Sequence, residues 1–230
     1  MTTIDPQVTL GDLVTTHPGL ARDLERLGLD YCCHGNRSLT DAATQAGLDP
    51  NEVVSTLAAV EAPGAPAEWT TMSLAELADH VQETHHKYLW EELPRLSQLV
   101  DKIAEVHGSR HPELAEVQRI YAQIRVAFEP HLRREELRDF PAIRHLDDRP
   151  DPELPQRLQA LIDEHDDVGE MLERLHEITG GYAVPDDGCN TYRLTYAGLA
   201  ELQSDTHLHV HKENNVLFPG AIERLAVTAG

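Results

Sequence analysis

Hydrophobic residues along most of this chain recur every three or four positions, which is the spacing of a helix with one apolar face. Beyond residue 70 the pattern fills four long segments, and the loops between the later ones carry Pro, Asp and Gly. Long helices connected in this way are typical of an antiparallel four-helix bundle. The sequence therefore predicts an all-α fold, with long helices over residues 74–107, 112–146, 152–179 and 191–224.

The amino-terminal part contains shorter apolar segments, and Gly28 and Gly47 mark the ends of two of them. These segments predict short helices over residues 10–14, 18–27, 39–46 and 51–60. Two prolines and a glycine then fall within residues 61–66, a composition typical of an exposed connector. We therefore expect a small helical domain over residues 1–62 and the bundle over residues 71–230.

Local signals refine the first two long helices. Ser73 and Glu76 have the spacing of a capping box, which begins a helix near Leu74. Pro94 and Pro130 lie inside the first and second long helices, and a proline there removes one backbone donor. We expect both prolines to kink or interrupt their helices.

Histidines and glutamates follow a pattern that occurs twice. A histidine is followed 44 or 45 positions later by a His-x-x-x-Glu pair, and a Phe-Pro pair begins nine residues after the second histidine, at Phe140 and Phe218. Two copies of one helical hairpin would give this repeat. The six residues are His86, His131, Glu135, His165, His209 and Glu213.

Helical periodicity places most of these six residues on the buried faces. On the second long helix, His131 and Glu135 continue an apolar stripe through Tyr121 and Phe128. Burying such groups is costly unless they are paired or bound to a metal, and residues four positions apart reach the same side of a helix. Four imidazoles and two carboxylates converging in a bundle core form a site for a pair of iron ions, and manganese and zinc accept the same ligands.

The first long helix offers two candidates for its ligand. Its apolar stripe places His85 nearer the centre, whereas the equal spacing of the two repeats favours His86. Three other histidines, His80, His207 and His211, fall off the stripes or at their edges. We expect them to face solvent or to support the ligands.

Two acidic residues and three cysteines carry weaker signals. Glu136 is expected to be a surface charge, and Glu164 either a solvated charge or a group that supports a ligand or handles protons. Cys32 and Cys33 are neighbours, which rarely bridge each other, so they are candidate redox or iron-transfer thiols, with a buried structural pair as the alternative. Cys189 is interpreted as incidental or as a further thiol.

The composition limits the partners and the location. Lys and Arg total 19 against 40 Asp and Glu, a formal charge of −21, which argues against nucleic acid and anionic membranes as partners. No run approaches 18 apolar residues, and the first residues, MTTIDPQVTL, have no basic stretch followed by an apolar core. The expected location is the cytoplasm.

Two motifs at opposite ends of the chain suggest a family. They are DYCCHG over residues 30–35 and HVHKENNVLFP over residues 209–219. In this order they resemble the iron-sulfur cluster repair di-iron proteins, which join a short ScdA-type amino-terminal domain with a Tyr-Cys-Cys motif to a hemerythrin-like four-helix bundle. This chain differs at His34, where the family usually has glycine, and at Arg138 and Asp139, where an apolar pair is usual.

The resemblance implies both a site and a function. It implies two iron ions in a carboxylate- and oxo-bridged centre, with bridging glutamates Glu135 and Glu213 and terminal histidines His86, His131, His165 and His209. It also implies repair of iron-sulfur clusters damaged by nitrosative or oxidative stress, through iron donation, nitric oxide chemistry or both. The expected partners are damaged iron-sulfur proteins, then oxygen, nitric oxide or peroxide as small ligands, and a second copy of the chain in a homodimer.

Two other functions remain open at this point. A hemerythrin-like bundle also suits an oxygen or nitric oxide carrier or sensor, although the Tyr-Cys-Cys domain argues against a simple carrier. A nitric oxide reductase or a peroxide-consuming enzyme is the other alternative, and the sequence shows no separate site for an electron donor. A purely structural adaptor is disfavoured by the duplicated ligand pattern.

Overall fold

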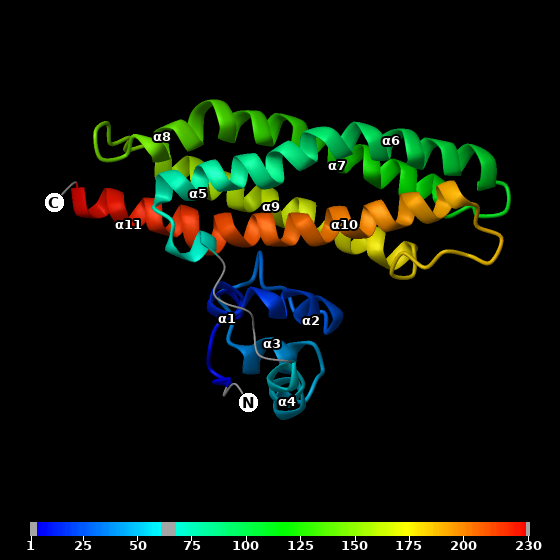
Figure 1. The fold of residues 1–230 in the computed structure, drawn as a ribbon, viewed down its shortest axis with the longest axis horizontal. Coiled ribbons are helices and arrows are strands. Elements are labelled where there is room, and N and C mark those ends of the chain that lie inside the picture. Colours follow the sequence, from blue (N-terminus) through cyan, green and yellow to red (C-terminus); the bar gives the residue numbers. More distant parts are fainter. Residues whose placement is uncertain (1–3, 61–67, 229–230) are drawn as a thin grey trace.

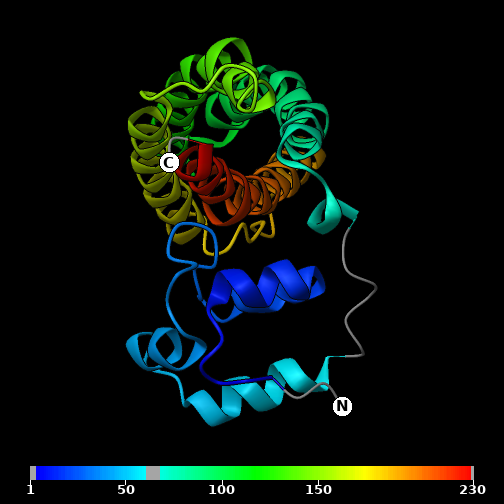
Figure 2. The same ribbon diagram turned by 90° about the vertical axis from the view of Figure 1, so that its left-hand side faces the viewer.

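The computed structural model describes residues 4–60 and 68–228 of the chain. Within these residues a small helical unit, residues 4–60, lies against one side of a long four-helix bundle, residues 68–228 (Figures 1 and 2). The prediction of an all-α fold is confirmed. The expected connector at residues 61–66 lies outside the described residues, so the domain boundary stays a prediction.

The N-terminal unit is made of short helices whose ends are set by their sequence. Side chains of Thr9, Ser38 and Asp49 accept hydrogen bonds from backbone amides of the first turns, as N-caps do. Gly28 and Gly47 have φ of 68° and 75°, the left-handed conformation that ends a helix. The elements are α1 (Leu10–Thr16), η1 (Pro18–Leu20), α2 (Ala21–Arg26), α3 (Leu39–Gln45) and α4 (Pro50–Ala59).

The first two long helices of the bundle are each divided by a π-helical turn. After the short η2 (Glu68–Thr71), Ser73 and Glu76 form the predicted capping box. Neither Pro94 nor Pro130 ends its helix. The first long helix comprises α5 (Leu74–Val81), η3 (Gln82–His86) and α6 (Lys87–His107), and the second comprises α7 (Leu114–Arg134), η4 (Glu135–Asp139) and α8 (Phe140–Arg144).

The other two long helices complete the bundle. The third, α9 (Leu154–Ile178), is a regular α-helix, whereas the fourth has a π-helical turn like the first two. This fourth helix comprises α10 (Asn190–Lys212), η5 (Glu213–Leu217) and α11 (Phe218–Thr228). No helix in the described part of the chain combines the length and apolar character needed to cross a membrane.

The apolar core of the bundle is split into two clusters. One fills the half that contains α6 and the first part of α10, with members such as Leu96, Ile124, Leu172 and Leu199. The other fills the half that contains α5 and α11, with members such as Leu77, Ile143, Leu158 and Leu217. The predicted ligands lie on the same helices between these two sets, so a polar layer crosses the middle of the bundle.

The N-terminal unit has a third core, to which the bundle contributes a residue. Its members include Leu10, Leu24, Leu39 and Leu57, and Val210 of α10 packs among them. Fully burying a side chain of this kind contributes about 1.5–3 kcal/mol. The unit is therefore held against α10, the helix that also carries the predicted ligand His209.

Candidate metal centre

The three π-helical turns each begin or end at a predicted ligand. His86 is the last residue of η3, while Glu135 and Glu213 are the first residues of η4 and η5. A π-helical turn holds more residues than an α-helical one, so it shifts the helix phase, and such turns are frequent at functional sites. The shift in η3 explains why a regular period favoured His85.

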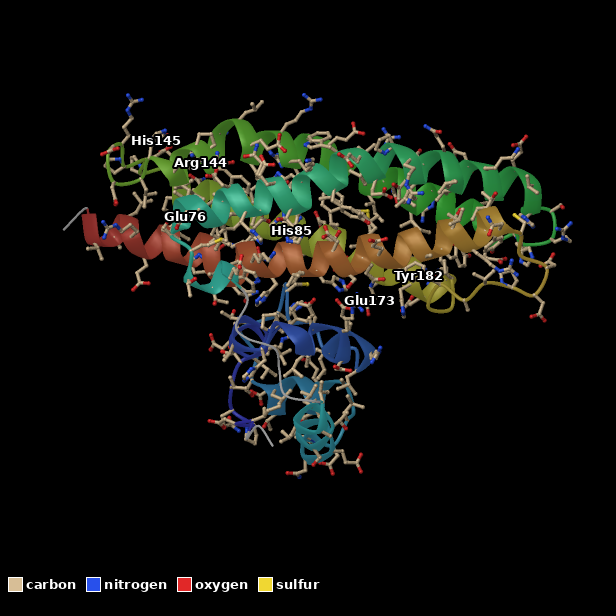
Figure 3. The ribbon with its side chains drawn as sticks, in the orientation of Figure 1. Glu76, His85, Arg144, His145, Glu173 and Tyr182 are labelled. Carbon is tan, nitrogen blue, oxygen red and sulfur yellow. The ribbon has the colours of Figure 1, made fainter. Side chains whose placement is uncertain are left out.

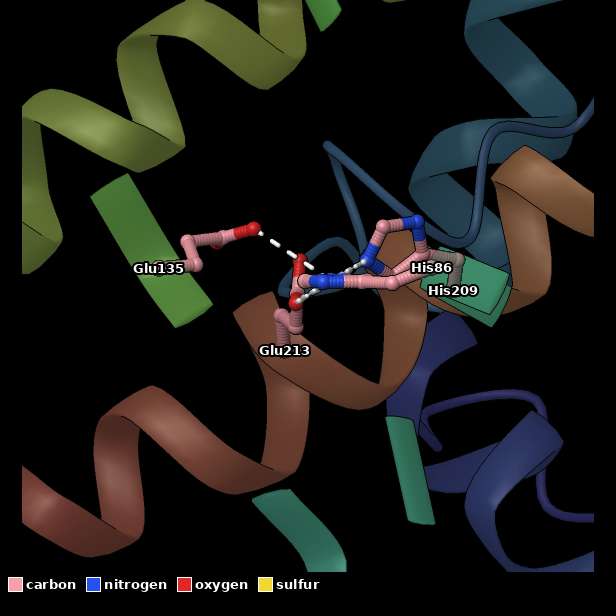
Figure 4. Close-up of side chains that lie close together, drawn as sticks. All are labelled: His86, Glu135, His209 and Glu213. Carbon is pink, nitrogen blue, oxygen red and sulfur yellow. Dashed lines mark hydrogen bonds and ion pairs between the residues drawn. The ribbon is translucent and has the colours of Figure 1, made fainter. Parts of the chain in front are cut away.

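Six buried side chains meet in the polar layer. Each has at most 4 % of its surface exposed. Figure 4 shows four of them, with the carboxylates of Glu135 and Glu213 pointing toward the rings of His86 and His209. The six are the predicted residues His86, His131, Glu135, His165, His209 and Glu213.

Each glutamate in this layer faces the two histidines of its own repeat. Glu135 Oε2 lies 3.4 Å from Nε2 of His86 and 3.3 Å from Nε2 of His131. Glu213 places Oε1 3.0 Å from Nε2 of His209 and Oε2 3.3 Å from Nε2 of His165. Glu135 therefore lies between His86 and His131, and Glu213 lies between His209 and His165.

The donor atoms form two overlapping groups. The first group combines both glutamates with His86 and His209, and the second combines them with His131 and His165. Within each group the donor atoms lie within 4.8 Å of one another. The two groups share both carboxylates, and each has ligand types that suit a cation.

Buried carboxylate atoms without a hydrogen bond support the fit of these residues to metal ions. Three buried carboxylate oxygens have no hydrogen-bond partner among the described residues. They are both oxygens of Glu135 and Oε2 of Glu213. Burying such a charge is costly unless it is paired or coordinates a metal. The buried His and Glu cluster thus suits metal binding.

Three of the four histidines are held by a partner on the second ring nitrogen. Nδ1 of His86 lies 3.1 Å from Glu136, that of His131 lies 2.9 Å from Glu164, and that of His165 lies 2.8 Å from Asn214 Oδ1. These acceptors fix the proton on Nδ1 and leave Nε2 free to face a metal. Among the described residues, Nδ1 of His209 has no hydrogen-bond partner.

Charges within the cluster shift the pKa of its members. Burial opposes protonation of His86 and His131, but neighbouring acidic groups outweigh it and raise the pKa to about 9 and about 10. Burial also favours neutral Glu213, yet His209 and the other histidines hold its pKa well below the ordinary value. For His165, burial and then the charge of His131 lower the pKa. Since metals bind the deprotonated forms, cations compete with protons here.

Two neighbouring residues differ from their predicted roles. Glu136 was expected on the surface, but it also accepts a hydrogen bond from Trp90 Nε1 at 2.8 Å and so belongs to the centre. His211, expected to face solvent or to support a ligand, is fully buried, with its ring 5.6 Å from that of Tyr31 and 5.9 Å from that of Trp69. Glu164 accepts a hydrogen bond from the candidate ligand His131, which agrees with one of its predicted roles.

His85 lies within the bundle (Figure 3) and is buried beside the cluster, and both of its ring nitrogens bond to groups outside the cluster. Its Nδ1 donates to Asp205 at 2.8 Å, and its Nε2 accepts from Lys212 Nζ at 2.7 Å. The same ammonium lies 2.9 Å from Nε2 of His80. Burial lowers the pKa of Lys212 to about 8, which leaves it protonated at neutral pH. Sequence reasoning gave no role to this lysine.

The loop with the two cysteines docks onto the bundle close to the ligands. It joins α2 to α3 and reaches α10 (Figure 1). Asn215 Nδ2 donates to the backbone oxygen of Cys32 at 2.9 Å, and Cys33 Sγ lies 3.8 Å from the backbone oxygen of His165. A Cβ at Gly35 would lie 2.3 Å from Asn215 Oδ1, so this close approach requires glycine.

The two thiols of this loop are free and lie 3.8 Å apart. Cys32 is buried, and its hydrogen bond with Cys33 together with burial raises the pKa of its thiol. Asp30 accepts hydrogen bonds from both backbone amides at 3.0 Å and lies 2.5 Å from Nδ1 of His34. The loop is therefore a compact, hydrogen-bonded structure next to the ligand layer.

A cavity leads from the surface to one side of the ligand layer. Its volume is about 260 Å³, and its lining includes His131, His165, Glu164, Arg134 and Pro130. It lies between α7 and α9, and a small molecule that enters it reaches two of the candidate ligands. Pro130, at which we expected a kink, forms part of this opening.

The fold and the site together define a hemerythrin-type cation-binding bundle with an added N-terminal unit. Residues 77–221 match the family model described as the hemerythrin HHE cation binding domain. Residues 6–61 match the ScdA_N model, described as a domain of unknown function.

Similar whole proteins carry one common name. The chain is 33% identical over 213 residues to the iron-sulfur cluster repair protein ScdA of Staphylococcus haemolyticus, covering 91% of this chain and 95% of the relative. It is 31% identical over 220 residues to a probable iron-sulfur cluster repair protein of Haemophilus influenzae, covering 93% and 96%. The protein YtfE of Enterobacter sp. is 30% identical over 213 residues, covering 93% and 96%. The chain therefore belongs to the iron-sulfur cluster repair protein family.

Proposed function

We propose that this protein binds two iron ions between its four helices and repairs damaged iron-sulfur clusters by donating iron to them. The observation that carries the proposal is the sharing of Glu135 and Glu213 by two groups of donor atoms. His86 and His209 would hold one ion, and His131 and His165 the other. The relatives are named as iron-sulfur cluster repair proteins, which supports the repair function, and the centre would supply the iron for it.

The chemistry of the site suits reversible binding. A carboxylate-bridged iron pair supplies two exchangeable metal ions that cycle between ferrous and ferric states. The raised pKa of His86 and His131 means that protons take the place of departing ions, which limits the electrostatic cost of release. Glu136, Glu164 and Asn214 keep three of the ligand rings oriented throughout.

We further propose that Cys32 and Cys33 act as redox or iron-transfer thiols. Cys33 Sγ lies beside the backbone of His165, so the thiols are close to the ligand layer, and thiolates bind iron well. In this proposal residues 1–62 form the ScdA-type domain that brings the thiols to the bundle of residues 71–230. The double variant Cys32→Ser/Cys33→Ser tests this role, because unchanged repair activity with full iron content would refute it.

The cavity beside His131 and His165 supports a second candidate function. A space of about 260 Å³ that reaches two ligands admits oxygen, nitric oxide or peroxide. We expect the centre to bind such molecules, whether or not it turns them over. Met171→Phe would narrow this cavity, and slower binding of nitric oxide by stopped-flow absorption is the expected result.

Metal analysis and a repair assay test the main proposal together. The purified protein is expected to hold about two irons per chain, with an absorption spectrum that bleaches on reduction by dithionite. Incubation with a target enzyme whose cluster was damaged by nitric oxide is expected to restore its activity. The variant Glu135→Ala/Glu213→Ala is expected to do neither, and equal repair by this variant would contradict the proposal. His145→Ala, at an exposed position far along the bundle, is the matched control (Figure 3).

A further inference from the structure

The duplicated pattern allows the surroundings of the two donor groups to be compared position by position. Aligning His86 with His165 pairs His85 with Glu164, since each residue directly precedes a ligand. Aligning the two His-x-x-x-Glu motifs pairs Arg134 with Lys212, since each directly precedes a glutamate. The equivalent pairs are therefore Glu164 with Arg134 and His85 with Lys212.

The first pair supports its neighbouring ligand with a carboxylate. Glu164 accepts the hydrogen bond from Nδ1 of His131 at 2.9 Å and also forms an ion pair with Arg134. Both side chains are partly exposed, by 37% and 44%. His131 thus has a negatively charged partner, and the charge of Arg134 is neutralised and in contact with solvent.

The second pair gives its neighbouring ligand no acceptor. The ring of His85 stacks on that of His209 with 5.3 Å between centroids and 6° between planes. Nδ1 of His209 has no hydrogen-bond partner among the described residues. Asp205 stands one helical turn before His209, but its carboxylate accepts from His85 instead.

Lys212 holds His85 in this arrangement. An ammonium group only donates, so the 2.7 Å contact makes Nε2 of His85 an acceptor and leaves its proton on Nδ1. Lys212 is 3% exposed, and its Nζ lies 5.6 Å from the ring of Trp69. The buried ammonium of Lys212 is therefore separated from His209 by the ring of His85 alone. At the equivalent place in the other half of the site, the carboxylate of Glu164 contacts His131 directly.

We propose that the two cation positions are unequal, and that His85 and Lys212 make the position of His86 and His209 the weaker one. At the other position both histidines have an acceptor on Nδ1, whereas here only His86 has one. Losing such a partner typically lowers metal affinity about 10–100-fold. The inference rests on the proposed two-cation site, and it identifies the ion held by His86 and His209 as the one given up first.

Titration of the metal-free protein with Co²⁺, followed by absorption in competition with a chelator, measures both affinities. The wild-type protein is expected to bind two Co²⁺ in steps whose affinities differ about tenfold or more. His85→Glu places a carboxylate between Lys212 and His209, as Glu164 stands between Arg134 and His131. It is expected to tighten the weaker step about tenfold and leave the tighter step unchanged.

Two further variants keep the test decisive if one protein fails to fold. Lys212→Met removes the cation while keeping an unbranched side chain, and it is expected to tighten the weaker step. Glu164→His, the reverse exchange at the equivalent position, is expected to weaken the tighter step about tenfold. His145→Glu makes the same change of charge at an exposed position and is expected to alter neither step. Circular dichroism confirms the fold of each variant.

The outcomes separate this inference from the proposed function. Two Co²⁺ bound with equal affinity, unaffected by His85→Glu and Lys212→Met, would overturn the inference and leave the two-cation site intact. Failure of the folded wild-type protein to bind two ions would overturn the proposed function, and the inference with it.

Discussion

The turns η4 and η5 have the same helical geometry but different outer surfaces. Both begin at a buried glutamate and both lead into a Phe-Pro pair. At equivalent positions Leu137 is 77% exposed, whereas Asn215 binds the cysteine loop of the N-terminal unit. The comparison shows that the inner face of the repeat is constrained by the ligand layer, while the outer face was free to become an interface in one copy.

The two phenylalanines that follow these turns should matter equally if the inner faces are equivalent. Phe140 stacks against His86 at 5.2 Å and Phe218 against His165 at 6.2 Å, and both are fully buried. We expect either change to Ala to lower the free energy of unfolding by about 3–5 kcal/mol. Urea denaturation of the metal-free protein measures this, and a difference above about 2 kcal/mol between the two variants would contradict the equivalence.

The two glutamates provide the second test of the equivalence. Glu135→Ala and Glu213→Ala each remove a group shared by both cation positions. We expect each to weaken metal binding by more than about 100-fold, because loss of a mere supporting partner already costs about 10–100-fold. Equilibrium dialysis against Co²⁺ measures the loss. Retention of one tightly bound ion by only one variant would show that the two carboxylates are not shared alike.

The outer faces should respond differently to truncation. Asn215→Ala removes the amide that bonds Cys32 and Tyr31, and we expect a loss of about 1–3 kcal/mol in the docking of the cysteine loop. Faster alkylation of Cys32 by iodoacetamide, followed by mass spectrometry, reports this loss. Leu137→Ala at the equivalent exposed position is the control, and equal alkylation rates in both variants would refute the difference.

The cysteines themselves extend the comparison to pH. Cys189 is exposed at the N-cap of α10, where the backbone amide of Tyr192 and then His107 lower the pKa of its thiol to about 7. The pKa of Cys32 is raised instead. Since the thiolate is the reactive form, alkylation of Cys189 should rise about tenfold between pH 6 and pH 8 and then level off. Faster modification of Cys32 than of Cys189 at pH 7 would contradict this.

Much of the fold followed from the sequence because its signals are local. Helical periodicity predicted the four long helices to within a few residues, and the capping box at Ser73 was placed correctly. The repeat with 44 and 45 residue spacings brought together the six side chains that the structure places in one layer. Their role as iron ligands stays a prediction.

The features that were missed depend on phase and on contacts between distant segments. Residue helix propensities did not predict the π-helical turn η3, in which His85 and His86 are both buried. The role of Asn215 requires a loop almost two hundred residues away in the sequence. Aligning the two repeats beyond their ligands would have singled out Lys212, which occupies the position of Arg134. The partner of Arg134 is the acidic Glu164, whereas the partner of Lys212 is an imidazole, that of His85.

Two consecutive asparagines connect the centre to the N-terminal unit through a single turn of backbone. Asn214 orients His165 and Asn215 holds the loop of Cys32, and both belong to η5. Neighbouring residues of one helical turn move together. The orientation of the His165 ring and the position of the two thiols are therefore coupled. A change in one is expressed as a change in the other.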